Sequence, residues 1–356
     1  MGRAGGPLAS GGASIPLYDS TRAVEEGLSE EDYEVALWEQ LYRDPLYELR
    51  ILANRSAAEG DFIPGQTTAG EELDERVRNL VVTDLMLQEK LQEAAIADIF
   101  DDAQRTVTSS QTYATAINTL SDEANTPAYS LAIARAIVAT AIMEREEGTL
   151  LAMDAPLRDE VIGLLNKELG GDRLAPALVD WVSKQISGLA LAIVTRQVRR
   201  KRGALSDFAS PGAGDILLYQ GHGGKIRDFI REVVRQSEEP VILLAHSLGG
   251  IACVDLLALE ELPQVKLLIT VGSQAPFFYE IDALFSLRYG EPLPAHFPPW
   301  LNIYDLRDFL SYIGTGVFKE NVQDILVDSK EPFPRSHGAY WSNAATWKAV
   351  KGRIEP

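Results

Sequence analysis

The sequence contains little cysteine, histidine and positive charge, and each shortage excludes a class of protein. Its 356 residues include one cysteine, Cys253, and four histidines. No intrachain disulfide can form, and no cysteine and histidine cluster has the spacing of a zinc site. The formal net charge of −19 repels phosphate and argues against nucleic acid as a partner. We therefore expect neither a metal nor any other cofactor.

Long apolar runs are also missing. The most apolar stretch, Ile186–Val194, has nine residues, well short of the roughly 20 that cross a membrane. The N-terminus has no signal-peptide apolar region, and Gly6 stands where a myristoylation signal has serine or threonine. These absences predict a cytoplasmic protein, and the hydrophobic content of 46% predicts a buried core rather than disorder.

The first half of the chain has the pattern of helices. Residues 1–20 are rich in glycine, alanine, serine and proline and predict a loop. Residues 21–205 show helical periodicity and no convincing strand. Helices are expected over Tyr33–Arg43, from Pro45 to Asn54, and over Glu71–Ala97, Thr126–Glu147, Asp154–Gly170 and Asp172–Arg202. The last of these is compatible with peripheral contact with a membrane or with burial against the other helices, and its basic end, Arg196–Arg202, is interpreted as a cationic helix terminus.

After a loop at Ser206–Gly214 the pattern changes to alternating strands and helices. Strands are expected over Asp215–Gln220, Pro240–His246, Val265–Gly272 and Leu301–Tyr304, and helices over Lys225–Gln236 and Leu248–Leu259. This alternation predicts an α/β fold with a parallel sheet flanked by helices. An uncovered edge strand at Asp215–Gln220 favours a homo-oligomer or a partner that completes the sheet edge.

The stretch Val241–Gly250 predicts a nucleophilic serine. A buried strand is followed by Ala-His-Ser-Leu-Gly-Gly and then by a helix. A strand, a tight turn of small residues and a helix are the context of the nucleophile elbow G-x-S-x-G, with Ala245 in place of the first glycine. The turn would expose Ser247 Oγ, and the helix start would place the Leu248 backbone N–H where an oxyanion forms. The alternative is a serine that caps an ordinary strand-to-helix turn.

A nucleophilic serine needs a base, and the chain offers four histidines. His246 adjoins the serine and points to the opposite face of its strand. His222 precedes the turn, and His296 lies among prolines before the last expected strand. His337 lies in a late loop before a C-terminal helix, where the base falls in the chain order Ser…Asp…His.

The base needs an orienting acid, which should follow a strand between Ser247 and His337. Asp308, a few residues beyond the strand Leu301–Tyr304, is the acid that we prefer. Asp305 is the alternative. Three residues of the right types in the right order are more specific than any one of them.

Four segments resemble the C-terminal half of an α/β-hydrolase of the lipase and esterase type: Ala245–Gly250, Val271–Pro276, Asn302–Asp308 and Ser336–Trp341. Residues 213–345 are similar in particular to bacterial serine hydrolases related to lecithin:cholesterol acyltransferase and to GPI-inositol-deacylase-like lipases. The resemblance implies an α/β-hydrolase core over 206–356 and an acyl-enzyme route with Ser247, Asp308 and His337. Residues 21–205 are expected to form a helical lid or insertion over an acyl-ester or lipid-like substrate, which His246 and Gln274 would contact.

The chain departs from this family in its oxyanion loop. We find no upstream strands with a His-Gly loop in the first 200 residues, and Gly221–Gly224 is interpreted as a loop that closes onto a helix. The expected function is carboxylic-ester hydrolysis by a serine esterase. Two alternatives remain open: an acyltransferase that uses the same triad, and a non-catalytic interaction module built on a hydrolase half.

Overall fold

The computed structural model describes residues 30–54, 67–145, 153–171, 212–238, 240–318 and 321–355. The expected loop at 1–20 and the expected helix Asp172–Arg202 lie outside these ranges. The described chain divides into two compact units. The helical unit contains residues 30–171, 305–309 and 327–355, and the sheet unit contains residues 212–304 and 310–326. The expected domain boundary near residue 205 divides the chain into two continuous parts. The helical unit of the structure also includes residues 305–309 and 327–355, which come after that boundary.

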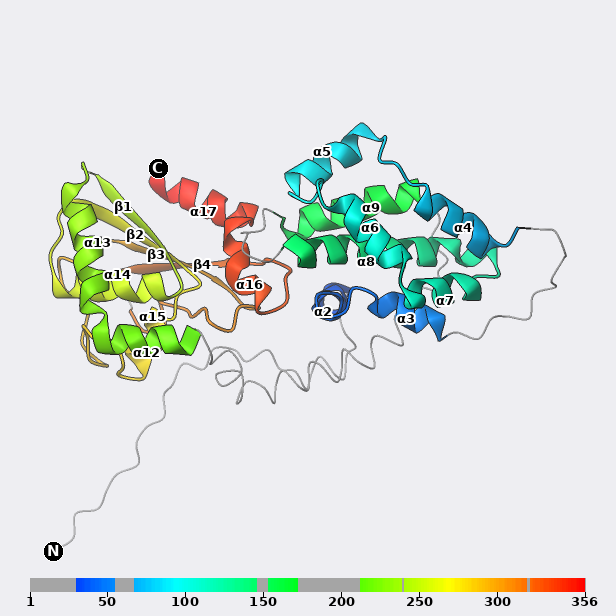
Figure 1. Ribbon diagram of the computed structural model, residues 1–356. Helices are drawn as coiled ribbons and strands as arrows, with labels where there is room; N and C mark the ends of the chain where they lie inside the picture. Colours follow the sequence, from blue (N-terminus) through cyan, green and yellow to red (C-terminus); the bar gives the residue numbers. More distant parts are fainter. Residues whose placement is uncertain are drawn as a thin grey trace, which may run out of the picture. The chain divides into compact units, whose positions relative to one another are not determined.

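The helical unit contains no strand between residues 30 and 171 in its described parts. Its elements are α2 (Glu30–Leu41), α3 (Tyr47–Ala53), α4 (Ala69–Arg78), α5 (Leu85–Glu93), α6 (Phe100–Thr108), α7 (Gln111–Thr119), η1 (Glu123–Asn125), α8 (Thr126–Arg145), α9 (Ala155–Glu168), α16 (Arg335–Gly338), η2 (Ala339–Trp341) and α17 (Ala344–Ile354) (Figure 1). The expected helical character of this part of the chain is therefore confirmed where the structure describes it.

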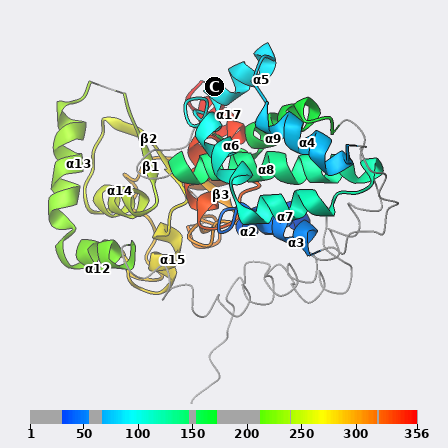
Figure 2. The same cartoon turned by 45° about the vertical axis from the view of Figure 1, so that its right-hand side comes forward.

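Helix α8 is the centre of the helical unit. It packs against α3, α6 and α9, which surround it in Figure 2. Most of its residues are buried, and alanines at many positions let the neighbouring helices approach closely. The helix Glu123–Arg145 is long and apolar enough to span a membrane, but 83% of its apolar window is buried inside the protein. Packing within the unit accounts for this composition.

Capping side chains explain where several helices begin. Asp154 accepts the backbone N–H of Leu157 at 2.9 Å, and Gly170 ends α9 with a φ of 84°, so this expected helix is confirmed. The single helix expected over Glu71–Ala97 is wrong. Helix α4 ends at Arg78, and Asp84 caps a new helix, α5, by accepting the N–H of Leu87 at 2.8 Å.

The sheet unit has the α/β architecture that the alternating pattern predicts. Its strands are β1 (Val241–His246), β2 (Val265–Val271), β3 (Trp300–Asp305) and β4 (Val322–Val327), and its helices are α12 (Gly212–His222), α13 (Gly224–Gln236), α14 (Leu248–Leu259) and α15 (Ala275–Glu280) (Figure 1). The strands form one sheet in the order β1-β2-β3-β4, with β1 parallel to β2 and β2 parallel to β3. The expected strands β1, β2 and β3 and the helices α13 and α14 are confirmed, whereas β4 was not predicted.

Helix α14 forms the core of the sheet unit. It packs on β1 and β2, and α13 packs on α14 in turn. Nine consecutive residues from Gly250 to Ala258 are buried, including Cys253. Burial raises the pKa of the Cys253 thiol to about 12, so this residue is a small apolar group in the core rather than a nucleophile.

The strand expected over Asp215–Gln220 is wrong, because these residues lie in α12. An apolar run of this length fits a buried strand and a helix equally well. In the helix, Tyr219 is 1% exposed and its hydroxyl donates to Asp255 of α14 at 2.7 Å, while Leu217 and Leu218 are 72% and 60% exposed. The edge strand that we expected at these residues is therefore absent, and β1 is the first strand of the sheet in the part of the chain that the structure describes. The expected homo-oligomer or partner at a sheet edge stays a prediction.

Candidate active site

Ser247 has a strained backbone conformation between β1 and α14. Its φ of 54° and ψ of −125° lie outside the regions that non-glycine residues populate. Its N–H donates to Val271 O at 3.1 Å, and its carbonyl accepts the N–H of Gly250 at 2.9 Å, so both sides of the turn are held. Such strain costs about 1–3 kcal/mol and clusters at functional sites. A strained serine between a strand and a helix is the geometry of a nucleophile elbow.

Close packing under the turn explains its glycines. A Cβ on Gly250 would lie 2.3 Å from Ser273 Oγ and 2.7 Å from Ser273 Cβ, so only glycine lets α14 approach the segment after β2. A Cβ on Gly249 would meet only Ala245 Cβ, at 3.9 Å, which is an ordinary contact. The space at Gly249 therefore explains why Ala245 is tolerated where the motif usually has its first glycine.

Two of the expected site residues lie beside Ser247 in the sheet unit. Leu248 is the first residue of α14, so its N–H has no acceptor within the helix and lies at the positive end of the helix dipole. Gln274 follows β2, and its Nε2 donates to Ser247 Oγ at 3.4 Å. His246 is the last residue of β1 and is partly exposed. The structure thus brings Leu248 and Gln274 to Ser247 and places His246 next to it in the chain.

The other two expected residues, Asp308 and His337, form a pair within the helical unit. His337 Nδ1 lies 2.9 Å from Asp308 Oδ2 and 3.1 Å from Oδ1. Asp308 is 2% exposed, and the Tyr340 hydroxyl donates to its Oδ2 at 2.8 Å. A buried carboxylate at Nδ1 favours the tautomer with the proton on that nitrogen. His337 Nε2 is then the basic nitrogen, as a general base requires.

Asp305, the alternative acid, bonds to backbone N–H groups of neighbouring segments. Its carboxylate accepts the backbone N–H of Arg307 and of Ser329, each at 2.8 Å, and its own N–H donates to the Tyr340 hydroxyl at 3.1 Å. Burial raises the pKa of Asp305, against the opposing effect of these backbone N–H groups. The geometry therefore favours Asp308 over Asp305 as the partner of His337.

A buried polar cluster anchors the segment that precedes His337. Arg158 of α9 donates to Glu331 Oε1 at 2.7 Å, and the hydroxyl of Tyr42 donates to Glu331 Oε2 at 3.0 Å. The guanidinium group of Arg335 lies 3.9 Å from the centre of the Tyr42 ring. We did not predict this cluster, and Tyr340 was missed as well. Their partners are far apart in the sequence, so no local pattern indicates them.

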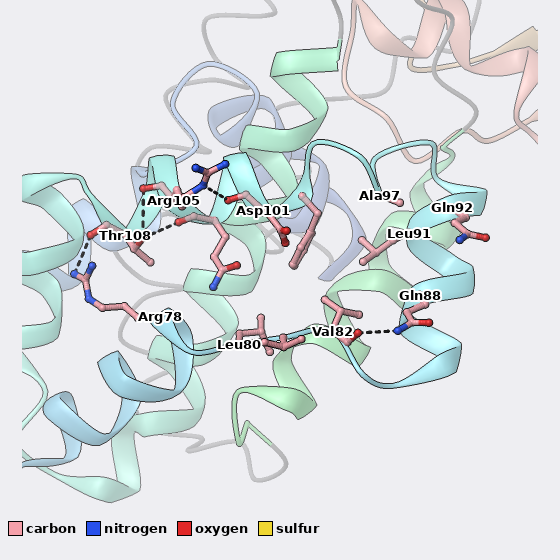
Figure 3. Close-up of a pocket in the computed structure, with 13 residues that line it drawn as sticks. Arg78, Leu80, Val82, Gln88, Leu91, Gln92, Ala97, Asp101, Arg105 and Thr108 are labelled. Atoms are coloured by element: carbon pink, nitrogen blue, oxygen red, sulfur yellow. Dashed lines mark hydrogen bonds between the residues drawn. The ribbon is translucent and has the colours of Figure 1, made fainter.

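The helical unit also has a pocket of about 680 Å³. Figure 3 shows it between the end of α4, α5 and α6, with Leu80, Val82 and Leu91 among its apolar residues. Gln88 Nε2 donates to Val82 O at 2.7 Å, and a guanidinium nitrogen of Arg78 donates to the backbone carbonyl of Thr108 at 3.0 Å. These polar groups bond to the unit's own backbone. None of the expected site residues lines this pocket.

Comparison with protein-family models, with curated proteins and with solved structures found no match to this chain. Within the described ranges, no group of three or more histidine, cysteine, aspartate or glutamate side chains could hold a metal ion. The chemistry is therefore inferred from two groups of residues: Ser247, Leu248 and Gln274 in the sheet unit, and Asp308 and His337 in the helical unit.

Proposed function

We propose that the protein is a serine hydrolase that cleaves carboxylic esters through an acyl-enzyme on Ser247. The backbone at Ser247, with a φ of 54° and a ψ of −125°, carries this proposal. A serine that caps a helix has an extended backbone, and its Oγ accepts an N–H of the first turn. Ser247 has neither feature. Its conformation supports a nucleophile over the capping serine of the alternative interpretation.

The order of the residues along the sheet also supports the proposal. Ser247 directly follows β1, Asp308 comes shortly after β3, and His337 comes after β4. Functional residues of open α/β sheets gather beyond the carboxyl ends of the strands. Ser…Asp…His is the chain order of α/β-hydrolase triads. A serine after one strand, an acid after a later strand and a histidine before a C-terminal helix are the order that the resemblance to the lipase and esterase type implies.

In the proposed mechanism, Ser247 Oγ attacks the ester carbonyl carbon while its proton passes to His337 Nε2. The new C–O bond displaces the carbonyl π electrons onto oxygen, and the Leu248 N–H donates to that oxyanion. The oxyanion then collapses, the bond to the alcohol breaks, and the alcohol leaves with the proton from His337. Water repeats the sequence and releases the acid, and Asp308 stabilises the imidazolium in both halves.

Hydrolysis of p-nitrophenyl esters from acetate to octanoate tests this mechanism. Ser247→Ala should lower kcat by more than about 1,000-fold, and Asp308→Asn by about 10,000-fold, because the wrong tautomer of His337 is then stabilised. Ser237→Ala, an exposed serine of the same unit, is the matched control and should keep full activity. Full turnover by folded Ser247→Ala, or no turnover of any ester by the folded wild type, would contradict the proposal.

A further inference from the structure

We propose that the side-chain amide of Gln274 is the second oxyanion donor, acting together with the Leu248 backbone N–H. This inference rests on the proposed serine hydrolase function. An oxyanion hole for acyl transfer uses preorganised donors aimed at the carbonyl oxygen, and backbone N–H groups and glutamine side chains both serve. The described sheet begins with strand β1. The His-Gly pair that precedes β1, His222-Gly223, lies between α12 and α13 and follows no strand of the described chain. A second donor must come from elsewhere.

The backbone of Gln274 is held against the nucleophile turn. Val271, the last residue of β2, pairs with His246 and accepts the N–H of Ser247. The chain then turns at Gly272, which has a φ of 58°. Ser273 follows, and its Oγ accepts the N–H of Ala275 at 3.2 Å and thereby supports the start of α15. Gln274 is thus positioned by the same strand pair that positions Ser247.

The packing of Ser273 adds a second constraint. Its side chain fills the space directly over Gly250 of α14, where an added Cβ would lie 2.3 Å from Oγ. The residue before Gln274 and the first turn of α14 are therefore in close contact. The backbone of Gln274 therefore cannot move away from Ser247 without separating α14 from the segment that follows β2.

The Gln274 side chain itself is buried and incompletely satisfied. It is 3% exposed, and Nε2 donates to Ser247 Oγ at 3.4 Å. Oε1 is buried and accepts no hydrogen bond from the described residues. Buried polar atoms are nearly always paired, so an unpaired one needs an explanation. The amide is therefore placed toward the nucleophile at the expense of its own hydrogen bonds.

The long contact in the free enzyme suits a donor that acts in the transition state. When Oγ bonds to the carbonyl carbon, negative charge develops on the carbonyl oxygen, which is bonded to that same carbon. Nε2 can then replace its 3.4 Å contact with Oγ by a bond of about 2.7–3.1 Å to the oxyanion. An interaction that strengthens only as charge develops raises kcat rather than substrate affinity.

Substitution of Gln274 by methionine tests the assignment, because methionine has a similar length and no donor. We expect kcat for ester hydrolysis to fall by about 100-fold to 1,000-fold, with KM changed by less than about twofold. The affinity for an alkyl trifluoromethyl ketone, which forms a tetrahedral oxyanion adduct with the serine, should fall by the same factor. Inhibition by the product carboxylic acid should not change. Gln236→Met, on the exposed end of α13, is the matched control.

Separate outcomes distinguish this inference from the function on which it rests. If Ser247→Ala abolishes turnover and Gln274→Met does not slow it, only the oxyanion assignment is overturned. If kcat falls but the ketone binds as before, Gln274 does not contact the oxyanion. If the wild type has no esterase activity, the proposed function and this inference both fail. Gln274→Leu, which also has no donor and adds no charge, should show the same loss and gives a second test if the methionine variant does not fold.

Discussion

The close contact between α14 and the segment after β2 predicts the effect of one methyl group. In Gly250→Ala, the added Cβ would lie 2.3 Å from Ser273 Oγ, 2.7 Å from Ser273 Cβ and 3.3 Å from Thr270 Cγ2. Rotation of Ser273 would move its Oγ away but would break the 3.2 Å bond from Ala275 N–H, and the contact with Cβ would remain. The backbone must therefore shift.

Overpacking of this kind costs about 1–3 kcal/mol. Alanine in place of glycine in a helix returns about 0.5–1 kcal/mol. We therefore expect Gly250→Ala to lower the free energy of unfolding by about 1–2 kcal/mol. Gly249→Ala is the matched control, because its Cβ would meet only Ala245 Cβ at 3.9 Å. It should be neutral or stabilising by up to about 1 kcal/mol.

Urea unfolding followed by circular dichroism measures both variants against the wild type, with the slope m compared as well. The same shift of α14 should move Ser247 relative to Gln274, so Gly250→Ala should also react more slowly with a fluorophosphonate. Gly249→Ala should react at a rate closer to that of the wild type. Equal urea midpoints for the two alanine variants would refute the packing argument.

Three further predictions concern buried groups. Arg158→Met removes the guanidinium group that lies 2.7 Å from the buried Glu331 carboxylate, and should lower the free energy of unfolding by about 3–5 kcal/mol. Arg50→Met breaks an exposed ion pair and should lower it by less than about 1 kcal/mol. Equal urea midpoints for these two variants would contradict the prediction. Tyr340→Phe removes a buried hydroxyl that bonds to the Asp305 N–H and to Asp308 Oδ2, and should lower the free energy of unfolding by about 1–3 kcal/mol. An unchanged urea midpoint would show that stability does not depend on these hydrogen bonds. Because burial raises the pKa of Cys253 to about 12, its thiol should react with a disulfide reagent at pH 8 only after unfolding, and rapid reaction of the folded protein would show that α14 is not packed as described.

The regular part of the sheet unit could be predicted from the sequence. Strands β1 and β2 are short aliphatic runs, and α14 begins directly after the small residues of the turn. Such runs are typical of strands that are covered on both faces, and β2 fits this description. In β1, Ile242 and Leu244 are 36% and 38% exposed, so its run identifies the strand but not the burial of both faces. Strand β4 was missed because Asp324 interrupts its apolar pattern. That carboxylate accepts the backbone N–H of Gly314 and of Thr315, a loop contact that the strand pattern does not indicate.

The residues of the candidate site could be predicted individually, but their partners could not. Small residues around Ser247 indicate a tight turn from sequence alone. Asp305 and Asp308 both follow the same strand, and only the three-dimensional structure shows which of them bonds to His337. The role of Tyr340 between the two aspartates depends on contacts across more than 30 positions of the chain, so no local spacing reveals it.

Labelling with a fluorophosphonate, followed by mass spectrometry of the peptides, tests the central claim most directly. An activated Ser247 predicts one phosphonylated residue in the wild type, at Ser247. No label should form in Ser247→Ala, and labelling should be strongly slowed in His337→Gln, with both variants folded by circular dichroism. Label on another serine, or labelling of His337→Gln at the wild-type rate, would contradict the account of Ser247 as a nucleophile activated by His337.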